Sequence, residues 1–376
     1  MIKTKVTCLR AEKIIHAFGV SVLVRLTVPD TSATGYAEQL MQRLTEVWAD
    51  SPTPRQNKKT ILEVDLGVVD DKKFERIQSV LSTEVTLAAL RAHSGDLLMF
   101  HAGGIARDDG KVAMIIGPSG VGKTTTMRHL GLHYGYVSDE TVAVNFQGEV
   151  LPYRKPLSII TDGHEFKVQV APSTLHLLPL PTAPLILSGI ALLKRPDTIE
   201  SDTVLEPIGL AQGLMMAIEQ TSYLGEIHRP LAKLASLASK VGGFKVMTVG
   251  TPERIHRVVE QIFDSREVPR WTSIMPDENR MPRTDTAFIP LNVVDAVECS
   301  DGTVVFTKDK QAILLDGIGP QLWRSSCNLE SWQQLINRIE ASFGPAPHMD
   351  TKSAIIKASD KLIEAGIISN NINDLR

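Results

Sequence analysis

The sequence has few cysteines, few aromatic residues and no block of like charges. Its three cysteines, Cys8, Cys299 and Cys327, lie far apart and match no metal-ligand spacing. This sparse, odd set argues against a disulfide framework and is typical of a reducing compartment, so we expect a cytoplasmic protein. The formal net charge is only -3. Charges of both signs are interspersed, which excludes a basic face for nucleic acid.

A long uninterrupted apolar segment is also missing. The longest apolar stretch, residues 175–193, is broken by prolines at positions 179, 181 and 184. This pattern favours buried strands joined by a proline turn over a membrane helix. The N-terminus lacks the charged-then-apolar pattern of a signal peptide. We therefore expect no membrane partner.

The chain is long enough for several packed domains. Its 376 residues predict two or three domains at about 100–200 residues each. We expect residues 1–95 to form a small accessory α/β domain, in which we find no catalytic or binding motif. Residues 96–264 are expected to form a nucleotide-binding domain. Residues 265–286 are polar and proline-bearing, which indicates a linker. Residues 287–376 read as a small sheet followed by three helices, a winged-helix-like domain.

One stretch carries a specific motif. The apolar run 112–116 leads into residues 117–124 (GPSGVGKT), which match the phosphate-loop pattern G-x-x-x-x-G-K-[ST], and a helical pattern follows. Backbone N–H groups of such a loop cradle phosphates, its lysine reaches the β/γ-phosphates, and its hydroxyl residue binds Mg²⁺. The expected ligands are thus ATP and Mg²⁺. The expected nucleotide-binding residues are Gly117, Pro118, Ser119, Gly120, Val121, Gly122, Lys123, Thr124 and Thr125.

Polar residues on both sides of this motif limit the classes of reaction that the site could catalyse. His101 lies in an apolar stretch that an Asp-Gly turn at residues 107–110 joins to the run before the loop, a hairpin signal. Asp139 and Glu140 follow Lys123 by 16 and 17 residues, where a strand after the first helix would end near the phosphates. Phosphoryl transfer needs a metal-binding carboxylate and a residue that orients or deprotonates the acceptor. The alternatives are a helix cap or turn acid for Asp139, an exposed acid for Glu140 and a hydrogen-bonded structural histidine for His101.

Residues 101–235 resemble the HPr kinase/phosphorylase catalytic domain, which has a phosphoenolpyruvate-carboxykinase-like P-loop fold. The resemblance rests on residues 101–104 (HAGG), the phosphate loop and the acidic pair. It implies that Asp139 is the general base, that Glu140 and Thr124 hold the metal, and that His101 lies near the γ-phosphate. Arg229, in the segment HRPLA, resembles an arginine that faces the transferring phosphate in that family; the alternative is a solvated surface charge.

The sequence departs from this family in two respects. The second acid is glutamate where the family usually has aspartate, and residues 157–165 (LSIITDGHE) replace the family's glycine-rich signature. Glu165 could take the place of the metal-binding glutamate of that signature. The chain is thus more similar to diverged relatives that phosphorylate peptide or small-molecule hydroxyls, including lasso-peptide tailoring kinases and a free-serine kinase. The family's rings of identical subunits imply a homo-oligomer.

The C-terminal domain resembles the PqqD-like module, a winged-helix fold that takes leader peptides as an added strand. The matching residues are 301–305 (DGTVV), 313–319 (ILLDGIG), Leu322, Trp323 and 362–368 (LIEAGII). An exposed edge strand at residues 303–307 would capture such a peptide by backbone hydrogen bonds.

The fold expected from these observations is α/β, with an HPr-kinase-like P-loop core between the two smaller domains. The expected function is an ATP-dependent kinase in which Lys123, Asp139, His101 and Arg229 act on the hydroxyl of a small molecule, peptide or protein serine. The alternative is a non-catalytic ATP-binding adaptor that hands a bound peptide to a partner.

Overall fold

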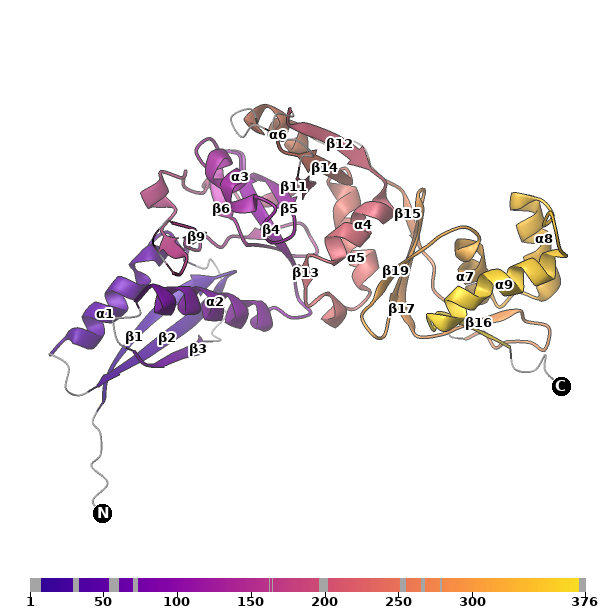
Figure 1. Ribbon diagram of the computed structural model, residues 1–376, viewed down its shortest axis with the longest axis horizontal. Coiled ribbons are helices and arrows are strands. Elements are labelled where there is room, and N and C mark those ends of the chain that lie inside the picture. Colours follow the sequence, from indigo (N-terminus) through magenta and orange to yellow (C-terminus); the bar gives the residue numbers. More distant parts are fainter. Residues whose placement is uncertain are drawn as a thin grey trace, which may run out of the picture. The chain divides into compact units, whose positions relative to one another are not determined.

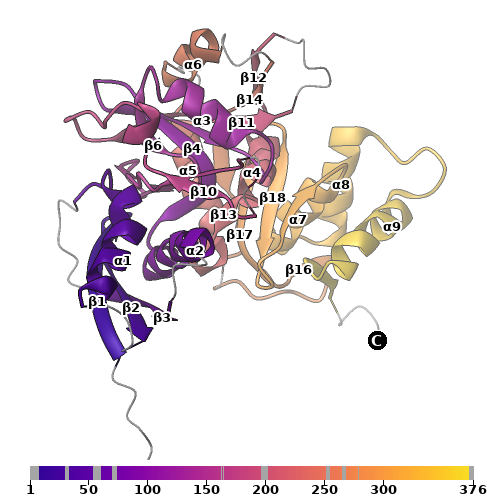
Figure 2. The same cartoon turned by 60° about the vertical axis from the view of Figure 1, so that its left-hand side comes forward.

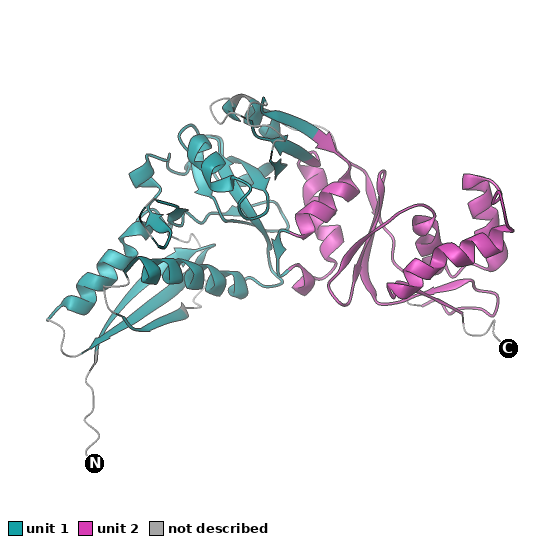
Figure 3. Cartoon of the chain, in the orientation of Figure 1, with its two compact units in different colours: residues 1–206, 220–223, 245–265 teal, residues 207–219, 224–244, 266–376 magenta. Residues whose placement is uncertain are grey.

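The chain folds as a mixed α/β protein in which groups of strands and helices follow one another along the sequence (Figure 1). The computed structural model describes residues 8–29, 34–53, 61–69, 74–161, 163, 165–195, 202–250, 255–264, 268–277 and 279–371. The chain forms two compact units (Figure 3). The first unit comprises residues 1–206, 220–223 and 245–265; the second comprises residues 207–219, 224–244 and 266–376. Among the described residues, no helix has the length and apolar character needed to cross a membrane.

The first unit begins with a three-stranded sheet covered by helices (Figures 1 and 2). Strand β2 is antiparallel to β1 and parallel to β3. Every second residue of β2 is fully buried, because the apolar side chains of one face pack against both helices while the other face is half exposed. The elements are β1 (Cys8–Ala17), β2 (Val20–Pro29), α1 (Tyr36–Thr45), a 3₁₀ turn η1 (Glu46–Trp48), β3 (Ile61–Val68) and α2 (Phe74–Ala92).

A nine-stranded sheet forms the centre of the first unit. Its order is β12-β14-β11-β5-β4-β7-β8, and β6 and β13 also pair with β4. The predicted hairpin around residues 107–110 is confirmed, since β4 and β5 are antiparallel neighbours joined there. The strands are β4 (Leu98–Ala106), β5 (Lys111–Ile116), β6 (Gly135–Ser138), β7 (Thr141–Val144), β8 (Val150–Leu151), β11 (Ile186–Lys194), β12 (Val204–Ile208), β13 (Thr221–Ser222) and β14 (Phe244–Thr248).

Helices α3 (Lys123–Leu130) and α6 (Ile255–Phe263) pack on this sheet. Their apolar side chains share one buried cluster with the strands; it includes Ile115, Met127, Ala191 and Val259. Helix α6 is described from Ile255, and residues 251–254 lie outside the described residues. A separate two-stranded ribbon, β9 (Leu157–Ile159) with β10 (Val168–Val170), and a 3₁₀ turn, η3 (Ser173–Leu175), complete this unit.

The second unit has its own core around a four-stranded sheet of order β15-β17-β18-β19. Strand β15 lies inside the segment that the sequence analysis interpreted as a linker, and it pairs with β17. The elements are α4 (Leu210–Ile218), η4 (Leu224–Glu226), α5 (Pro230–Lys240), β15 (Trp271–Ser273), β16 (Phe288–Pro290), β17 (Val293–Cys299), β18 (Gly302–Thr307), β19 (Ala312–Leu315), α7 (Gly319–Asn328), α8 (Trp332–Phe343), α9 (Thr351–Glu364) and β20 (Ile368–Asn370).

Helices α4 and α5 group with the C-terminal residues, although the sequence analysis assigned them to the nucleotide-binding domain. Two aspartates of the second unit explain this grouping. Asp301 accepts hydrogen bonds from the first-turn N–H groups of Ala211 and Gln212 in α4. Asp295, which is fully buried, accepts one from Ala232 in α5. Each carboxylate therefore satisfies N–H groups at a helix N-terminus that have no partner within the helix.

The prediction that residues 303–307 form an exposed edge strand is wrong. Strand β18 pairs with β17 on one side and with β19 on the other. Its residues from Thr303 to Thr307 are all buried. In the part of this sheet that the structure describes, the edges are β15 and β19.

Candidate functional site

The glycine-rich loop, residues 117–122, leaves the buried strand β5 and ends where α3 begins at Lys123. Gly120 and Gly122 have positive φ values of 78° and 107°, a backbone conformation that residues with a Cβ atom rarely adopt. Ser119, Gly120 and Gly122 are exposed, as is Thr125 in the first turn of the helix. The sequence thus places an open turn of backbone at a helix N-terminus, the arrangement that binds anions elsewhere.

Lys123 is 6% exposed and lies folded back on the loop. Its Nζ atom donates hydrogen bonds to the carbonyl oxygens of Gly117 and Pro118, at 2.5 and 2.9 Å. Burial lowers the pKa of this ammonium to about 8, although the charges of Asp139 and Glu140 oppose the shift. The lysine is therefore a buried cation that neutral carbonyls partner only weakly, and an added anion would stabilise its charged form.

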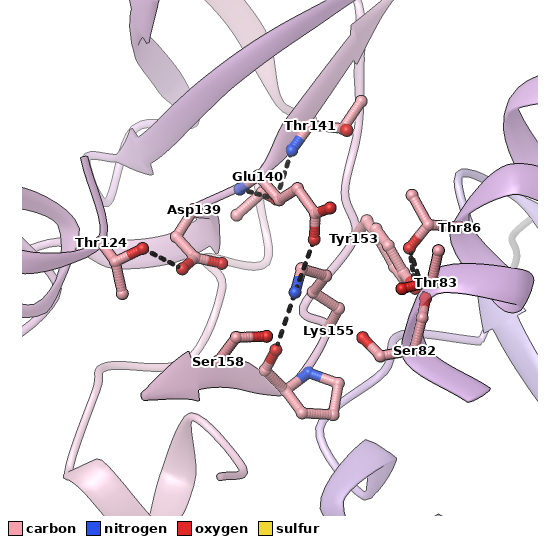
Figure 4. A network of polar contacts seen from close by, with 12 residues as sticks. Ser82, Thr83, Thr86, Thr124, Asp139, Glu140, Thr141, Tyr153, Lys155 and Ser158 are labelled. Atoms are coloured by element: carbon pink, nitrogen blue, oxygen red, sulfur yellow. Dashed lines mark hydrogen bonds and ion pairs between the residues drawn. The ribbon is translucent and has the colours of Figure 1, made fainter. Parts of the chain in front are cut away.

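A contact between Thr124 and Asp139 joins the two parts of the predicted site, which are the phosphate loop and the acidic pair. The Thr124 hydroxyl donates to Oδ2 of Asp139 at 2.9 Å, and Figure 4 shows the carboxylate turned toward this threonine. The hydroxyl of Tyr136 donates to the other carboxylate oxygen, also at 2.9 Å. Burial, and then the charge of Asp139, raise the pKa of Tyr136 well above its usual value, so the phenol remains a donor. Asp139 is 5% exposed, and its two oxygens retain lone pairs for further partners.

Glu140 points away from Thr124, toward a lysine that the sequence analysis did not single out. Its carboxylate lies 2.6 Å from Nζ of Lys155 (Figure 4), which also donates to the Pro156 carbonyl at 3.1 Å. Burial raises the pKa of the Glu140 carboxyl, but the charge and hydrogen bond of Lys155 outweigh it, so the net shift is downward. The pKa of Lys155 is raised: burial opposes the shift, and the charges of Glu140 and Asp139 outweigh it. The carboxylate predicted as a metal ligand is thus neutralised by a buried ammonium.

His101 stands beside both the loop and the acidic pair because of the sheet register. In β4 it pairs with Thr141, and its carbonyl accepts the N–H of Gly117 at 3.4 Å. Its Nδ1 lies 3.0 Å from the Glu140 carbonyl, which can only accept, so Nδ1 carries a proton. Burial first, and then the charge of Lys123, lower the pKa of His101. The ring is therefore neutral near pH 7, with a lone pair on Nε2.

The other predicted residues do not join this cluster within the first unit. Arg229 belongs to the second unit. There it adopts a positive φ of 53° before α5, contacts Asp295 at 3.8 Å and donates to the Ser273 hydroxyl. Glu165 is exposed, and its neighbours at positions 162 and 164 lie outside the described residues. The structure therefore gathers His101, Lys123, Thr124, Asp139 and Glu140 in one place.

The gathered groups could hold Mg²⁺ with the help of a substrate. Among the described residues, no three His, Cys, Asp or Glu side chains form a metal-binding group by themselves. Mg²⁺, however, is usually bound by one or two protein oxygens together with substrate phosphates and water. The hydroxyl of Thr124 and the carboxylate of Asp139 are such hard oxygen donors, at adjoining positions. Comparison with known proteins adds no relative: no protein-family model matches this chain, and no curated protein matches it.

Proposed function

We propose that this protein is an ATP-dependent kinase that transfers the γ-phosphoryl group to a hydroxyl. The observation that carries the proposal is the hydrogen bond between Thr124 and Asp139. It connects the last residue of the phosphate-loop motif, at the start of α3, to a carboxylate that follows 15 residues later in the sequence. A chance glycine-rich turn needs no such partner, whereas phosphoryl transfer needs oxygen donors and a proton acceptor beside the phosphates.

We also infer the finer fold from these features. The buried strand, glycine-rich loop and helix, with an antiparallel strand carrying His101 beside them, support an HPr-kinase-like P-loop core in the first unit. The antiparallel sheet followed by α7, α8 and α9 supports a winged-helix-like, PqqD-like domain at the C-terminus. Strand β19 or β15, rather than β18, would then offer the edge that receives an extended peptide.

In this proposal the loop N–H groups bind the phosphates of ATP, and Lys123 turns from its carbonyl partners to the phosphate oxygens. Mg²⁺ would be held by Thr124 and the phosphates, with Asp139 next to it, and would neutralise charge on the phosphate oxygens. The acceptor oxygen attacks the γ-phosphorus, the bond to the bridging oxygen breaks, and ADP leaves with the electron pair. Asp139 takes the acceptor proton; the neutral His101 is the second group that could do so.

The acceptor that we propose is a hydroxyl of a small molecule, a peptide or a protein serine. The test follows ADP release with added free serine and serine-containing peptides. Wild type is compared with Lys123→Ala and Asp139→Asn, and Arg128→Ala on α3 serves as the exposed control. We expect acceptor-stimulated ADP release in wild type and control only. Equal turnover in all four proteins would refute the proposal.

One observation favours the alternative, a non-catalytic ATP-binding adaptor. Lys155 forms an ion pair with the carboxylate of Glu140. The site therefore has fewer acidic oxygens for Mg²⁺ than expected when Glu140 was predicted as a metal ligand. An adaptor would bind ATP, change its capture of a peptide in response, and yield no phosphorylated product. Mass spectrometry of the peptide after incubation with MgATP separates the two functions.

A further inference from the structure

The end of strand β11 lies directly against the glycine-rich loop. Strands β11 and β5 are parallel neighbours, with Leu192 opposite Ile116. A Cβ atom placed on Gly117 would lie 3.1 Å from Cβ of Leu193. Parallel strands that end together deliver their next residues to the same edge of the sheet, where ligands of open α/β folds bind. Lys194 and Arg195 therefore emerge at the loop, although neither belongs to its motif.

Arg195 contacts the loop itself. Its guanidinium donates from Nη2 to the carbonyl oxygen of Gly120, and the residue is exposed. The acceptor is a neutral carbonyl and occupies one of the five N–H donors of the guanidinium. Lys123 makes the same kind of contact on the loop, to Gly117 and Pro118. Two cations, one at the start of α3 and one just after β11, thus donate to carbonyl oxygens of the loop.

We propose that Arg195 is a second phosphate-binding cation of this site. When a nucleotide occupies the loop, the guanidinium exchanges the Gly120 carbonyl for oxygens of the phosphate chain. Guanidinium–phosphate hydrogen bonds are charge-assisted and often bidentate, and are therefore stronger than a bond to a neutral carbonyl. The inference rests on the proposed function, because it requires a nucleotide in the loop. The opposing interpretation is that Arg195 only stabilises the conformation of the loop.

Calorimetric titration with MgATP and with MgADP, which measures the dissociation constant of each, distinguishes these roles. The proteins are wild type, Arg195→Ala, Arg195→Lys and Arg128→Ala. Arg128→Ala is the control, because it also removes an exposed arginine, here from the last turn of α3. We expect Arg195→Ala to weaken MgATP binding about tenfold or more, as the loss of a charged hydrogen bond does. Arg195→Lys should retain part of the affinity, since it keeps the charge without the fork, and Arg128→Ala should bind as wild type does.

Two outcomes would overturn the inference, and they are separable. If wild type binds MgATP and Arg195→Ala binds it equally well or more tightly, Arg195 is no phosphate ligand and the proposed function stands. If wild type binds neither nucleotide, both fail. Because Arg195 is exposed, its variants should fold normally, which an unchanged thermal unfolding midpoint without nucleotide verifies.

Discussion

The carboxylate of Glu140 lies 2.6 Å from the ammonium of Lys155, whose side chain is 3% exposed. Removing the acid would leave this buried cation without its counter-charge, which is far costlier than losing an exposed pair. Glu140 itself is 40% exposed, so solvent screening reduces the effect. We expect Glu140→Gln to lower the free energy of unfolding by about 1–3 kcal/mol. The exposed Glu149→Gln, in the turn before β8, should cost far less; similar costs in chemical denaturation would contradict this account.

The same pair predicts a pH dependence. The folded-state pKa of Glu140 is below its usual value of 4.5, so its stabilising contribution is complete above that value and is lost as the pH falls through the folded-state pKa. The difference in unfolding free energy between wild type and Glu140→Gln should be full at pH 7 and shrink below about pH 4.5. A difference that grows toward acid pH would have the wrong sign.

Nucleotide binding should change the protonation of Lys123. Its pKa of about 8 reflects burial, and phosphate charges beside it would raise that value. At pH 8 we expect MgATP binding to take up roughly half a proton, and at pH 7 much less. Calorimetry in buffers of different ionisation enthalpy measures this uptake. Arg128→Ala should take up as much as wild type, and proton release at pH 8 would contradict the assignment.

His101 should titrate below its usual pKa of 6.5, because burial and the charge of Lys123 both lower it. The carbon-bound ring protons of His101 report this value by NMR. Lys123→Met should raise the pKa, because it removes one of the two causes that lower it. A wild-type value above 6.5, or no rise in the variant, would contradict this account.

Asp301 should stabilise the first turn of α4. Loss of its two hydrogen bonds in Asp301→Ala leaves the N–H groups of Ala211 and Gln212 without these partners, at a cost of about 1 kcal/mol. Hydrogen exchange of residues 210–218 should accelerate accordingly. Asp309→Ala, at an exposed position in the turn before β19, is the control; equal exchange in both variants would contradict the capping role.

Local signals explain why much of the first unit could be predicted. The glycine-rich motif between an apolar run and a helical pattern is continuous in sequence, as is the turn at residues 107–110 that joins β4 to β5. Strands of two or three residues, such as β13 and β15, gave no periodic signal, because distant partners define them. The apolar run of β18 carried a usable signal, because a short continuous run of apolar residues is typical of a strand that is buried on both faces.

The contacts of charged side chains could not be predicted in this way. Nothing in residues 151–156 indicates that Lys155 is buried. Its partner, Glu140, is separated from it in sequence by strands β7 and β8. Arg229 matched a short family segment, yet its acidic partner Asp295 comes from the C-terminal sheet. Arg195 follows β11 without any motif, and only the parallel pairing with β5 reveals that it lies at the loop.

The most direct test of the central claim is acceptor-stimulated phosphoryl transfer from γ-labelled ATP. Wild type, Lys123→Ala, Asp139→Asn and Arg128→Ala are incubated with MgATP and serine-containing acceptors, and the label on the acceptor is measured. The account predicts label in wild type and Arg128→Ala, and at least about a hundredfold less in the two site variants, because Asp139→Asn removes the proton acceptor and Lys123→Ala removes the cation that stabilises the phosphate charge. Equal labelling in all four proteins, or ATP binding with no labelled product from any acceptor, would contradict it.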